Sequence, residues 1–467
     1  MIARIPRAAA AGLALLLLTA CASTRPWINH PAAVGAEVVQ EGTLAPAPRP
    51  IVGAVTLSGG GARAAAFGLG VLQELKATRY EMDGRETTLL DEVGLISGVS
   101  GGSVLASYYA AFGDETFERF ERDFLLVNFQ TGLIRQATSP GTLYRLSSPW
   151  YGRSNVLAQR LEGVFRGETF GDVRKRRPWP RLLVTATDLT TGAPFEFTPE
   201  QFSLICSDLD SVPLSVAVAA SSSVPLLLSP MTLRNYGGTC APPARHPDAD
   251  ESHRNLSARF LRMIADSYSN AQQRPYIHLV DGGLADNLGV RGLVDHVTAS
   301  GSLHESFHQL PTGSVHKIVL VVVDSERDLA DRIDESERVP STAQVLDAMI
   351  FGAGSRWTAE TTEIVKETAR RAAEEVRAAR GRDGSAFAPD AEVFVINLRL
   401  RDLQDARTRQ RLLQVPTAFE ILPSDSRQLQ AAGREVLRAS PEFQRLRRSL
   451  GLDAGFAAAA HAEPERN

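Results

Sequence analysis

One serine stands out by its surroundings. Ser100 lies in the stretch Gly98-Val99-Ser100-Gly101-Gly102, after an apolar run at 93–96 and before apolar residues at helical spacing in 103–112. This order predicts a strand, a sharp turn and a helix, with the Ser100 hydroxyl projecting from the turn beside the helix N-terminus. The glycines are needed because a Cβ there would crowd the turn or an approaching substrate. Ser100 is a candidate nucleophile, although a Gly/Ser-rich loop without chemistry gives the same short pattern.

A second glycine-rich stretch offers what a nucleophilic serine needs. Gly59, Gly60 and Gly61 join an expected strand at 51–57 to an expected helix from Ala64. Backbone N–H groups in such a loop point outward, with the positive end of the helix dipole behind them. In acyl transfer these amides, with that of Gly101, could stabilise the oxyanion of the transition state. A helix start without any ligand is the simpler alternative.

The same loop also fits a loose dinucleotide fingerprint. Gly59-x-Gly61-x-x-Ala64 satisfies the spacing G-x-G-x-x-G/A. That fingerprint expects an acidic residue about 20 positions later, at the end of a second strand. Residues 80–86 occupy this position here and are expected to form a loop, so the dinucleotide hypothesis is the weaker one.

The candidate base is Asp281, which follows an apolar run at 276–280 and precedes Gly282-Gly283. In parallel α/β sheets, sites form at the carboxyl ends of strands, which would bring Asp281 to Ser100. Asp281 could instead cap the next helix or order the turn. A rival arrangement is a Ser-His-Asp triad, for which His278, His296 and His316 are the candidate bases.

Taken in order, three blocks resemble the patatin-like phospholipases: Gly59-Gly60-Gly61-Ala62-Arg63, Gly98-Val99-Ser100-Gly101-Gly102 and Asp281-Gly282-Gly283. Further similarity lies at 185–192 and 219–230, so that the resemblance covers about residues 52–324. Ala64 follows Arg63 where many relatives have glycine. The resemblance implies a three-layer α/β/α fold and a catalytic dyad without histidine. It implies Ser100 as nucleophile, Asp281 as base, and supporting roles for Arg63, Gly98, Gly282 and Gly283.

Such a dyad makes one physical demand. A free aspartate has a pKa near 3.9 and is a poor base at pH 7. A pocket that removes Asp281 from water would raise this pKa. The apolar residues Leu226, Leu227 and Leu228 are candidates to line that pocket and to receive an acyl chain.

The hydropathy pattern predicts an α/β domain with a mostly parallel central sheet and a helical C-terminal extension. Strands are expected at 51–57, 93–96, 181–189, 194–198, 276–280, 317–324 and 392–398. Long helical stretches are expected at 341–380 and 423–450. The expected divisions are a leader at 1–20, an Ala/Pro-rich tether at 21–50, a catalytic domain at 51–330, a mainly helical region at 331–452 and a flexible tail at 453–467.

The N-terminus has the features of an export signal. Arg4 and Arg7 precede an apolar stretch at 8–18 that is too short to span a bilayer. Leu18-Thr19-Ala20-Cys21 resembles the bacterial lipobox, which implies that Cys21 carries the lipid; an ordinary secretory signal is the alternative. Ala22 follows, and by analogy with Gram-negative lipoproteins it implies the outer membrane, facing the periplasm. Cys206 and Cys240 remain for either a disulfide or two buried thiols.

The amino-acid composition limits the kinds of molecule that the protein is expected to bind. The 467-residue chain is 43% apolar and 22% charged, with a net charge of −4 and no polybasic block, which argues against nucleic acid. No metal or other cofactor is implied, and protein partners are unknown. The leading hypothesis is a lipid-anchored hydrolase of phospholipids or other acyl-ester lipids. The alternatives are an envelope lipoprotein that binds lipid or a partner without catalysis, and a Ser-His-Asp esterase.

Overall fold

The computed structural model describes residues 24–33, 49–82, 84–240, 255–307, 310–327, 333, 336–341, 344, 345, 348 and 353–452. The expected leader, Cys21 and the tail at 453–467 lie outside these residues. The strands are β1 Ile51–Leu57, β2 Arg79–Met82, β3 Arg85–Thr88, β4 Val93–Val99, β5 Arg181–Asp188, β6 Pro194–Glu196, β7 Met231–Arg234, β8 Tyr276–Val280, β9 Val315–Asp324 and β10 Phe387–Arg399.

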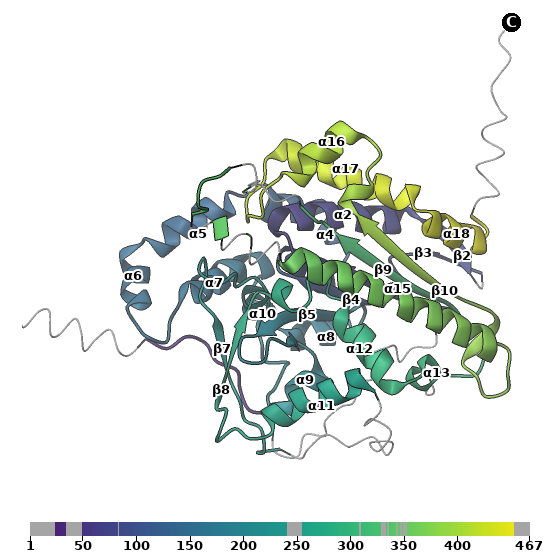
Figure 1. Cartoon of the computed structure of the whole chain (residues 1–467), viewed down its shortest axis with the longest axis horizontal. Coiled ribbons are helices and arrows are strands. Elements are labelled where there is room, and N and C mark those ends of the chain that lie inside the picture. Colours follow the sequence, from purple (N-terminus) through teal and green to yellow (C-terminus); the bar gives the residue numbers. More distant parts are fainter. Residues whose placement is uncertain are drawn as a thin grey trace, which may run out of the picture.

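Helices cover the sheet on two faces (Figure 1). In the first part of the chain they are α2 Gly61–Ala77, α3 Gly101–Phe112, α4 Glu115–Phe120, α5 Phe129–Ala137, α6 Pro140–Leu146, α7 Arg153–Phe165, α8 Phe170–Arg176, α9 Pro199–Leu204 and α10 Leu214–Ser221. In the second part they are α11 Leu256–Tyr268, α12 Arg291–Ser300, α13 Leu303–Ser306, α15 Ala353–Ala379, α16 Ala406–Leu413, α17 Pro423–Ala439 and α18 Pro441–Ser449.

The described residues form one large mixed sheet in the order β10-β9-β1-β4-β5-β8-β7, with β6 beside β5. The first five strands of this order are parallel, whereas β6 and β8 are antiparallel to β5, and β7 is antiparallel to β8. Because β1 and β4 are parallel neighbours, the loops after Leu57 and Val99 emerge at the same edge of the sheet. The predicted mostly parallel α/β architecture is confirmed.

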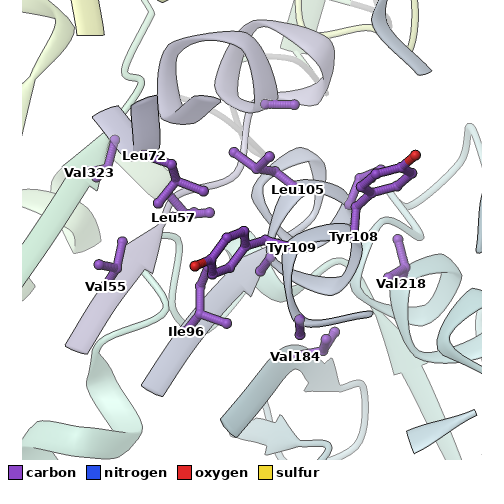
Figure 2. Close-up of a cluster of buried hydrophobic side chains, with 14 of the residues drawn as sticks. Val55, Leu57, Leu72, Ile96, Leu105, Tyr108, Tyr109, Val184, Val218 and Val323 are labelled. Carbon is purple, nitrogen blue, oxygen red and sulfur yellow. The ribbon is translucent and has the colours of Figure 1, made fainter. Parts of the chain in front are cut away.

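The core explains why the parallel strands read as continuous apolar runs. Val55, Leu57 and Ile96 point from the sheet toward Leu105 and Tyr109 of α3 (Figure 2). On the other face, Val322 of β9 packs with residues of α12 and α15. Strands buried on both sides carry apolar residues at successive positions, as in β1, which is buried along its whole length.

Two features differ from the sequence-based expectations. Residues 79–88 form the hairpin β2–β3 rather than a loop, and β7 is a strand that no pattern indicated. The strand expected at 392–398 is present as the longer β10, an edge strand paired with β9. In the same C-terminal region α17 packs closely on α2. A Cβ at Gly70 of α2 would lie 2.0 Å from the Gln430 carbonyl oxygen, so glycine allows this close approach.

Residues 24–33, part of the expected tether, lie against the domain. Asn29 is fully buried; its side chain donates to the Ser207 hydroxyl at 2.8 Å and accepts from the Arg234 amide at 2.7 Å. Pro31 forms an isolated bridge with Ser207. A buried, hydrogen-bonded side chain fixes this segment beside β7.

Candidate active site

Ser100 sits at the turn between β4 and α3 in a backbone conformation that favours glycine, with φ 49° and ψ −120°. The turn is tight: a Cβ at Gly98 would lie 2.6 Å from the Gly102 carbonyl oxygen, and one at Gly102 would lie 2.4 Å from that of Leu57. A non-glycine residue keeps such a conformation only when its surroundings fix it. Here the Ser100 N–H donates to the Ser221 hydroxyl at 2.8 Å.

The glycine loop after β1 packs directly on the Ser100 turn. A Cβ at Gly101 would lie 2.0 Å from the Gly61 carbonyl oxygen, and one at Gly59 would lie 3.5 Å from the Ser100 Cβ. Gly60 and Gly61 have φ values of 138° and 61°, which turn the chain sharply into α2. The two glycine-rich blocks recognised in the sequence therefore meet in space.

The amides of this loop are not equivalent. The Gly59 N–H donates to the Asn287 carbonyl oxygen at 3.0 Å. This corrects the expectation that Gly59 is an oxyanion donor, because its proton is already bound. Within the described residues, the N–H groups of Gly60, Gly61 and Gly101 have no hydrogen-bond acceptor. These three amides are available to an anion beside Ser100.

Arg63 supports the loop from behind. Its side chain is buried, donating from Nε to the Ser325 carbonyl at 2.9 Å and from Nη1 to the Val415 carbonyl at 2.7 Å. Burial lowers the pKa of this guanidinium to about 9. Arg63 thus ties the glycine loop to the end of β9 and to the C-terminal region.

Asp281 is buried, with 8% of its surface exposed, and Ser100 is equally enclosed at 6%. Burial raises the pKa of the Asp281 carboxyl to about 6, while hydrogen bonds from the Gly283 N–H and the Ser100 hydroxyl oppose that rise. The Gly283 N–H donates to Asp281 Oδ1 at 2.8 Å. Asp281 and the Ser100 hydroxyl therefore face each other in a site nearly closed to water, where a carboxylate is a stronger base.

The route by which Asp281 reaches the site differs from the expected one. It follows β8, which is antiparallel to β5, with Thr187 opposite Val280. The strand therefore runs back toward the sheet instead of ending at the common carboxyl edge. A Cβ at Gly282 would lie 2.1 Å from the Thr185 carbonyl oxygen, so glycine is needed for this approach. The expected proximity holds, but parallel-strand geometry is not its cause.

Two residues near the site have contacts that the sequence did not predict, although Ser221 falls in the stretch 219–230 that resembles the family. Ser221 accepts from the Ser100 N–H and donates to the Thr185 carbonyl at 2.6 Å. Asn287 Oδ1 lies 2.6 Å from the position of a Cβ on Gly59 and 3.1 Å from that on Gly283. Asn287 therefore lies between the glycine loop and the turn that carries Asp281. The polar pair Asp286-Asn287, shortly after Gly282-Gly283, was the available signal.

The candidate histidines are engaged elsewhere. His278 Nδ1 pairs with Thr232 Oγ1 at 3.0 Å on the surface, and His316 Nδ1 pairs with Asp390 Oδ1 at 2.7 Å. His296 lies on α12 with an exposed side chain. In the described parts of the chain, no histidine is hydrogen-bonded to Ser100 or Asp281. Of the three leucines expected to line an acyl pocket, Leu226 and Leu227 are exposed, whereas Leu228 is half-buried against the core.

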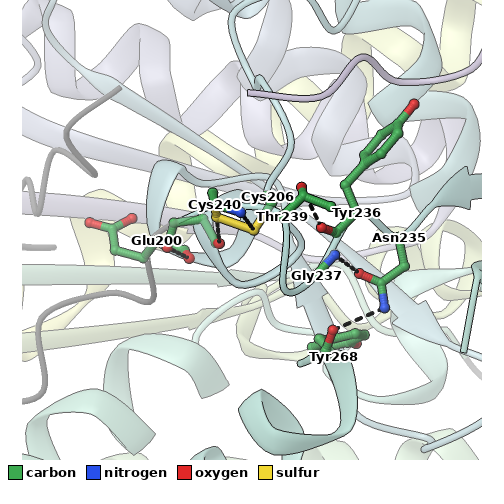
Figure 3. The surroundings of a disulfide bond; sticks show 9 residues. Glu200, Cys206, Asn235, Tyr236, Gly237, Thr239, Cys240 and Tyr268 are labelled. Carbon is green, nitrogen blue, oxygen red and sulfur yellow. Dashed lines mark hydrogen bonds between the residues drawn. A yellow bond between two sulfur atoms is a disulfide. The ribbon is translucent and has the colours of Figure 1, made fainter. Parts of the chain in front are cut away.

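Cys206 and Cys240 form a disulfide with a Cα–Cα distance of 5.5 Å, next to the loop of Asn235 and Tyr236 (Figure 3). This settles the alternative left open by the sequence. Across the described ranges, no three His, Cys, Asp or Glu side chains are grouped to hold a metal ion. No helix among the same residues has the length and hydropathy required to cross a membrane.

The family model described as patatin-like phospholipase matches residues 55–294, about half of the chain, and includes all three blocks. The chain belongs to the patatin-like phospholipase family. None of the curated proteins matches it significantly.

Among solved structures, human GIVD cytosolic phospholipase A2 is similar with a TM-score of 0.43 and 12% identity, covering 87% of this chain and 60% of that one. The same human protein in complex with methyl gamma-linolenyl fluorophosphonate gives a TM-score of 0.40, again at 12% identity and with the same coverage of both chains. This chain thus spans about 60% of the length of these structural relatives.

Proposed function

We propose that this protein is a serine acyl-ester hydrolase of the phospholipase A or lysophospholipase type, working through a Ser100–Asp281 dyad. The observation that carries the proposal is the enclosed Ser100 hydroxyl facing a buried carboxyl whose pKa lies near 6. Membership of the patatin-like phospholipase family supports a lipid ester as substrate. The absence of a histidine partner for Ser100 among the described residues favours the dyad over a triad.

The reaction would proceed through an acyl-enzyme. The Ser100 oxygen attacks the ester carbonyl carbon while its proton passes to the Asp281 carboxylate. The N–H groups of Gly60, Gly61 and Gly101 bind the resulting oxyanion, each contributing a few kcal/mol in the transition state. The tetrahedral intermediate then expels the alcohol, which takes the proton from Asp281. Water then attacks the acyl-enzyme carbonyl while its proton passes to Asp281. The second tetrahedral intermediate collapses, the Ser100 oxygen leaves and takes the proton back from Asp281, and the fatty acid is released.

We further propose that Cys21 is lipidated and anchors the chain in the bacterial outer membrane, facing the periplasm. The Cys206–Cys240 disulfide supports an oxidising compartment outside the cytosol. The lipobox-like stretch supports the anchor, and a lipid substrate would then be within reach of an enzyme held on its own membrane.

The test combines a fluorophosphonate probe with hydrolysis of phospholipid and lysophospholipid. Ser100→Ala should remove both labelling and hydrolysis. Asp281→Asn should keep the hydroxyl but lower the rate by roughly 10²- to 10⁴-fold, the usual contribution of a general base. His278→Ala is the matched control and should retain full activity. Labelling that survives Ser100→Ala, or loss of activity in His278→Ala, would overturn the dyad.

A further inference from the structure

One flank of the molecule is made by α5, α6 and the start of α7 (Figure 1). The sequence of this flank carries positive charges and no carboxylates. Residues 124–161 contain Arg135, Arg145, Arg153 and Arg160 but no Asp or Glu, in a chain whose net charge is −4. Within the described residues, none of these four arginines forms an ion pair with a carboxylate. The flank therefore presents positive charge that the protein itself does not neutralise.

Apolar side chains are exposed on the same flank. The exposed fractions are 57% for Ile134, 54% for Leu143, 41% for Trp150, 59% for Leu226 and 71% for Leu227. We call these five residues the docking face. Leu226 has a φ of 71°, a conformation that costs free energy for a non-glycine residue. Exposed apolar groups gathered in this way typically mark an interaction surface.

Hydrogen bonds join the docking face to the candidate active site. Arg153, three residues after Trp150, donates from Nη2 to the Leu226 carbonyl oxygen at 2.7 Å. The neighbouring Ser154 hydroxyl accepts from the Ser223 hydroxyl at 2.8 Å. The Ser223 carbonyl oxygen in turn accepts from the Asp281 N–H at 2.9 Å. Leu226 of the docking face is thus linked through the start of α7 to the loop that holds the candidate base.

The N-terminal segment is fixed at the same place. The Ser148 hydroxyl donates to the Thr24 carbonyl oxygen at 2.6 Å, and the Arg25 guanidinium lies 3.3 Å from the centre of the Trp150 ring. Cys21 precedes Thr24 by three residues, so chain geometry keeps it within about 11 Å of this point. A lipid on Cys21 would therefore leave the protein beside the docking face.

We propose that the docking face binds the surface of an anionic phospholipid bilayer and holds the neighbouring candidate active site close to it. This proposal rests on the proposed function. Exposed Leu, Ile and Trp side chains beside arginines are the chemistry that enters the interfacial region of a membrane. A lipid anchor starting at the same flank would keep this face down. A protein partner would not need the face and the anchor point to coincide.

The test measures contact between Trp150 and lipid. The full chain, produced with its leader and carrying Ser100→Ala to prevent hydrolysis, is incorporated into vesicles of phosphatidylglycerol and phosphatidylcholine with brominated acyl chains. The emission of Trp150 is obtained as the difference from a Trp150→Phe variant. Bromine should reduce this emission by about twofold or more, because an interfacial tryptophan lies at the depth of the label.

Ile134→Glu/Leu143→Glu adds two carboxylates to the docking face without touching the active site. It should abolish the quenching and, in the Ser100 background, lower hydrolysis of vesicle lipid by about tenfold or more, while hydrolysis of a soluble short-chain ester is unchanged. Met263→Glu, equally exposed on α11, is the control and should change neither.

Two results would overturn the docking proposal. One is Trp150 emission that bromine does not reduce, although the protein co-floats with the vesicles. That result is expected if the face binds another protein and not the bilayer. The other is quenching that the double variant leaves intact. Quenching of Trp150 is measured in the Ser100→Ala variant and does not depend on catalysis. If Trp150 is quenched but the protein with Ser100 intact hydrolyses no ester, the proposed function is wrong and the docking proposal is still supported.

Discussion

Asp281→Asn separates the role of the candidate base in chemistry from its cost to the fold. Burial raises the pKa of this carboxyl from 3.8 to about 6, so the folded protein holds the proton more tightly than the unfolded chain does. The stability that this group contributes is therefore complete below about pH 4 and is lost as the pH rises through 6. A shift of about two units corresponds to about 3 kcal/mol at pH 8, and to roughly half of that at pH 5.

The amide of Asp281→Asn has the same shape, never ionises, and can still accept the Gly283 N–H. We expect a variant that hydrolyses esters roughly 10²- to 10⁴-fold more slowly than the parent. It should be more stable than the parent by up to about 3 kcal/mol at pH 8 and by about half as much at pH 5. Urea unfolding followed by tryptophan fluorescence at the two pH values measures both differences. A gain in stability that does not depend on pH, or a variant that hydrolyses esters as fast as the parent, would refute the reasoning.

Asp91→Asn is a control in which the expected change in stability has the opposite sign. Although burial raises the pKa of Asp91, hydrogen bonds from Lys76 and Thr88 bring it below its usual value. The folded state therefore favours the ionised form of Asp91, and its stabilisation is present at pH 8 and lost in acid. Asp91→Asn should destabilise the protein at pH 8 and leave activity unchanged, which separates the effect of a buried base from the general effect of removing a carboxylate.

Three further outcomes are expected. The rate of ester hydrolysis should rise with pH through about 6 and level off above it, because Asp281 acts as a base only in its carboxylate form. Initial rates measured over a series of pH values test this. Ser221→Ala should lower kcat by about tenfold and leave KM nearly unchanged, since the Ser100 N–H loses its acceptor. Cys206→Ser/Cys240→Ser should reduce the free energy of unfolding by about 3–4 kcal/mol, the chain-entropy value for a loop of 34 residues, measured by urea unfolding.

What the sequence could predict depends on how local each feature is. The strand–turn–helix around Ser100 follows from glycines and apolar residues that are close in the chain, and it forms as expected. The apolar runs of the parallel strands are equally local signals. The antiparallel course of β8 is not, because direction is set by the neighbouring strand. The hairpin β2–β3 was missed because its alternating polar residues resemble a loop.

The same distinction applies within the site. Ser100, Asp281 and the glycine loop carry recognisable motifs, so their meeting could be anticipated from the family resemblance. Ser221 could not be assigned a role, because its contact with the Ser100 N–H joins residues 121 positions apart. Nor could the loss of Gly59 as a donor be foreseen, since it depends on one carbonyl group of Asn287. Motifs thus locate the reacting groups, while tertiary contacts decide which amides are available to the substrate.

The contacts of the C-terminal region change how the glycine loop should be understood. The family model ends at residue 294, yet the Ala62 N–H donates to the Ala418 carbonyl oxygen at 2.7 Å, and Arg63 reaches the Val415 carbonyl. A Cβ at Gly61 would lie 2.3 Å from the same Ala418 oxygen. Preformed donors stabilise an oxyanion only if they need no rearrangement during the reaction. The segment before α17 supplies that rigidity, so residues far outside the recognisable motifs belong to the physical basis of the site.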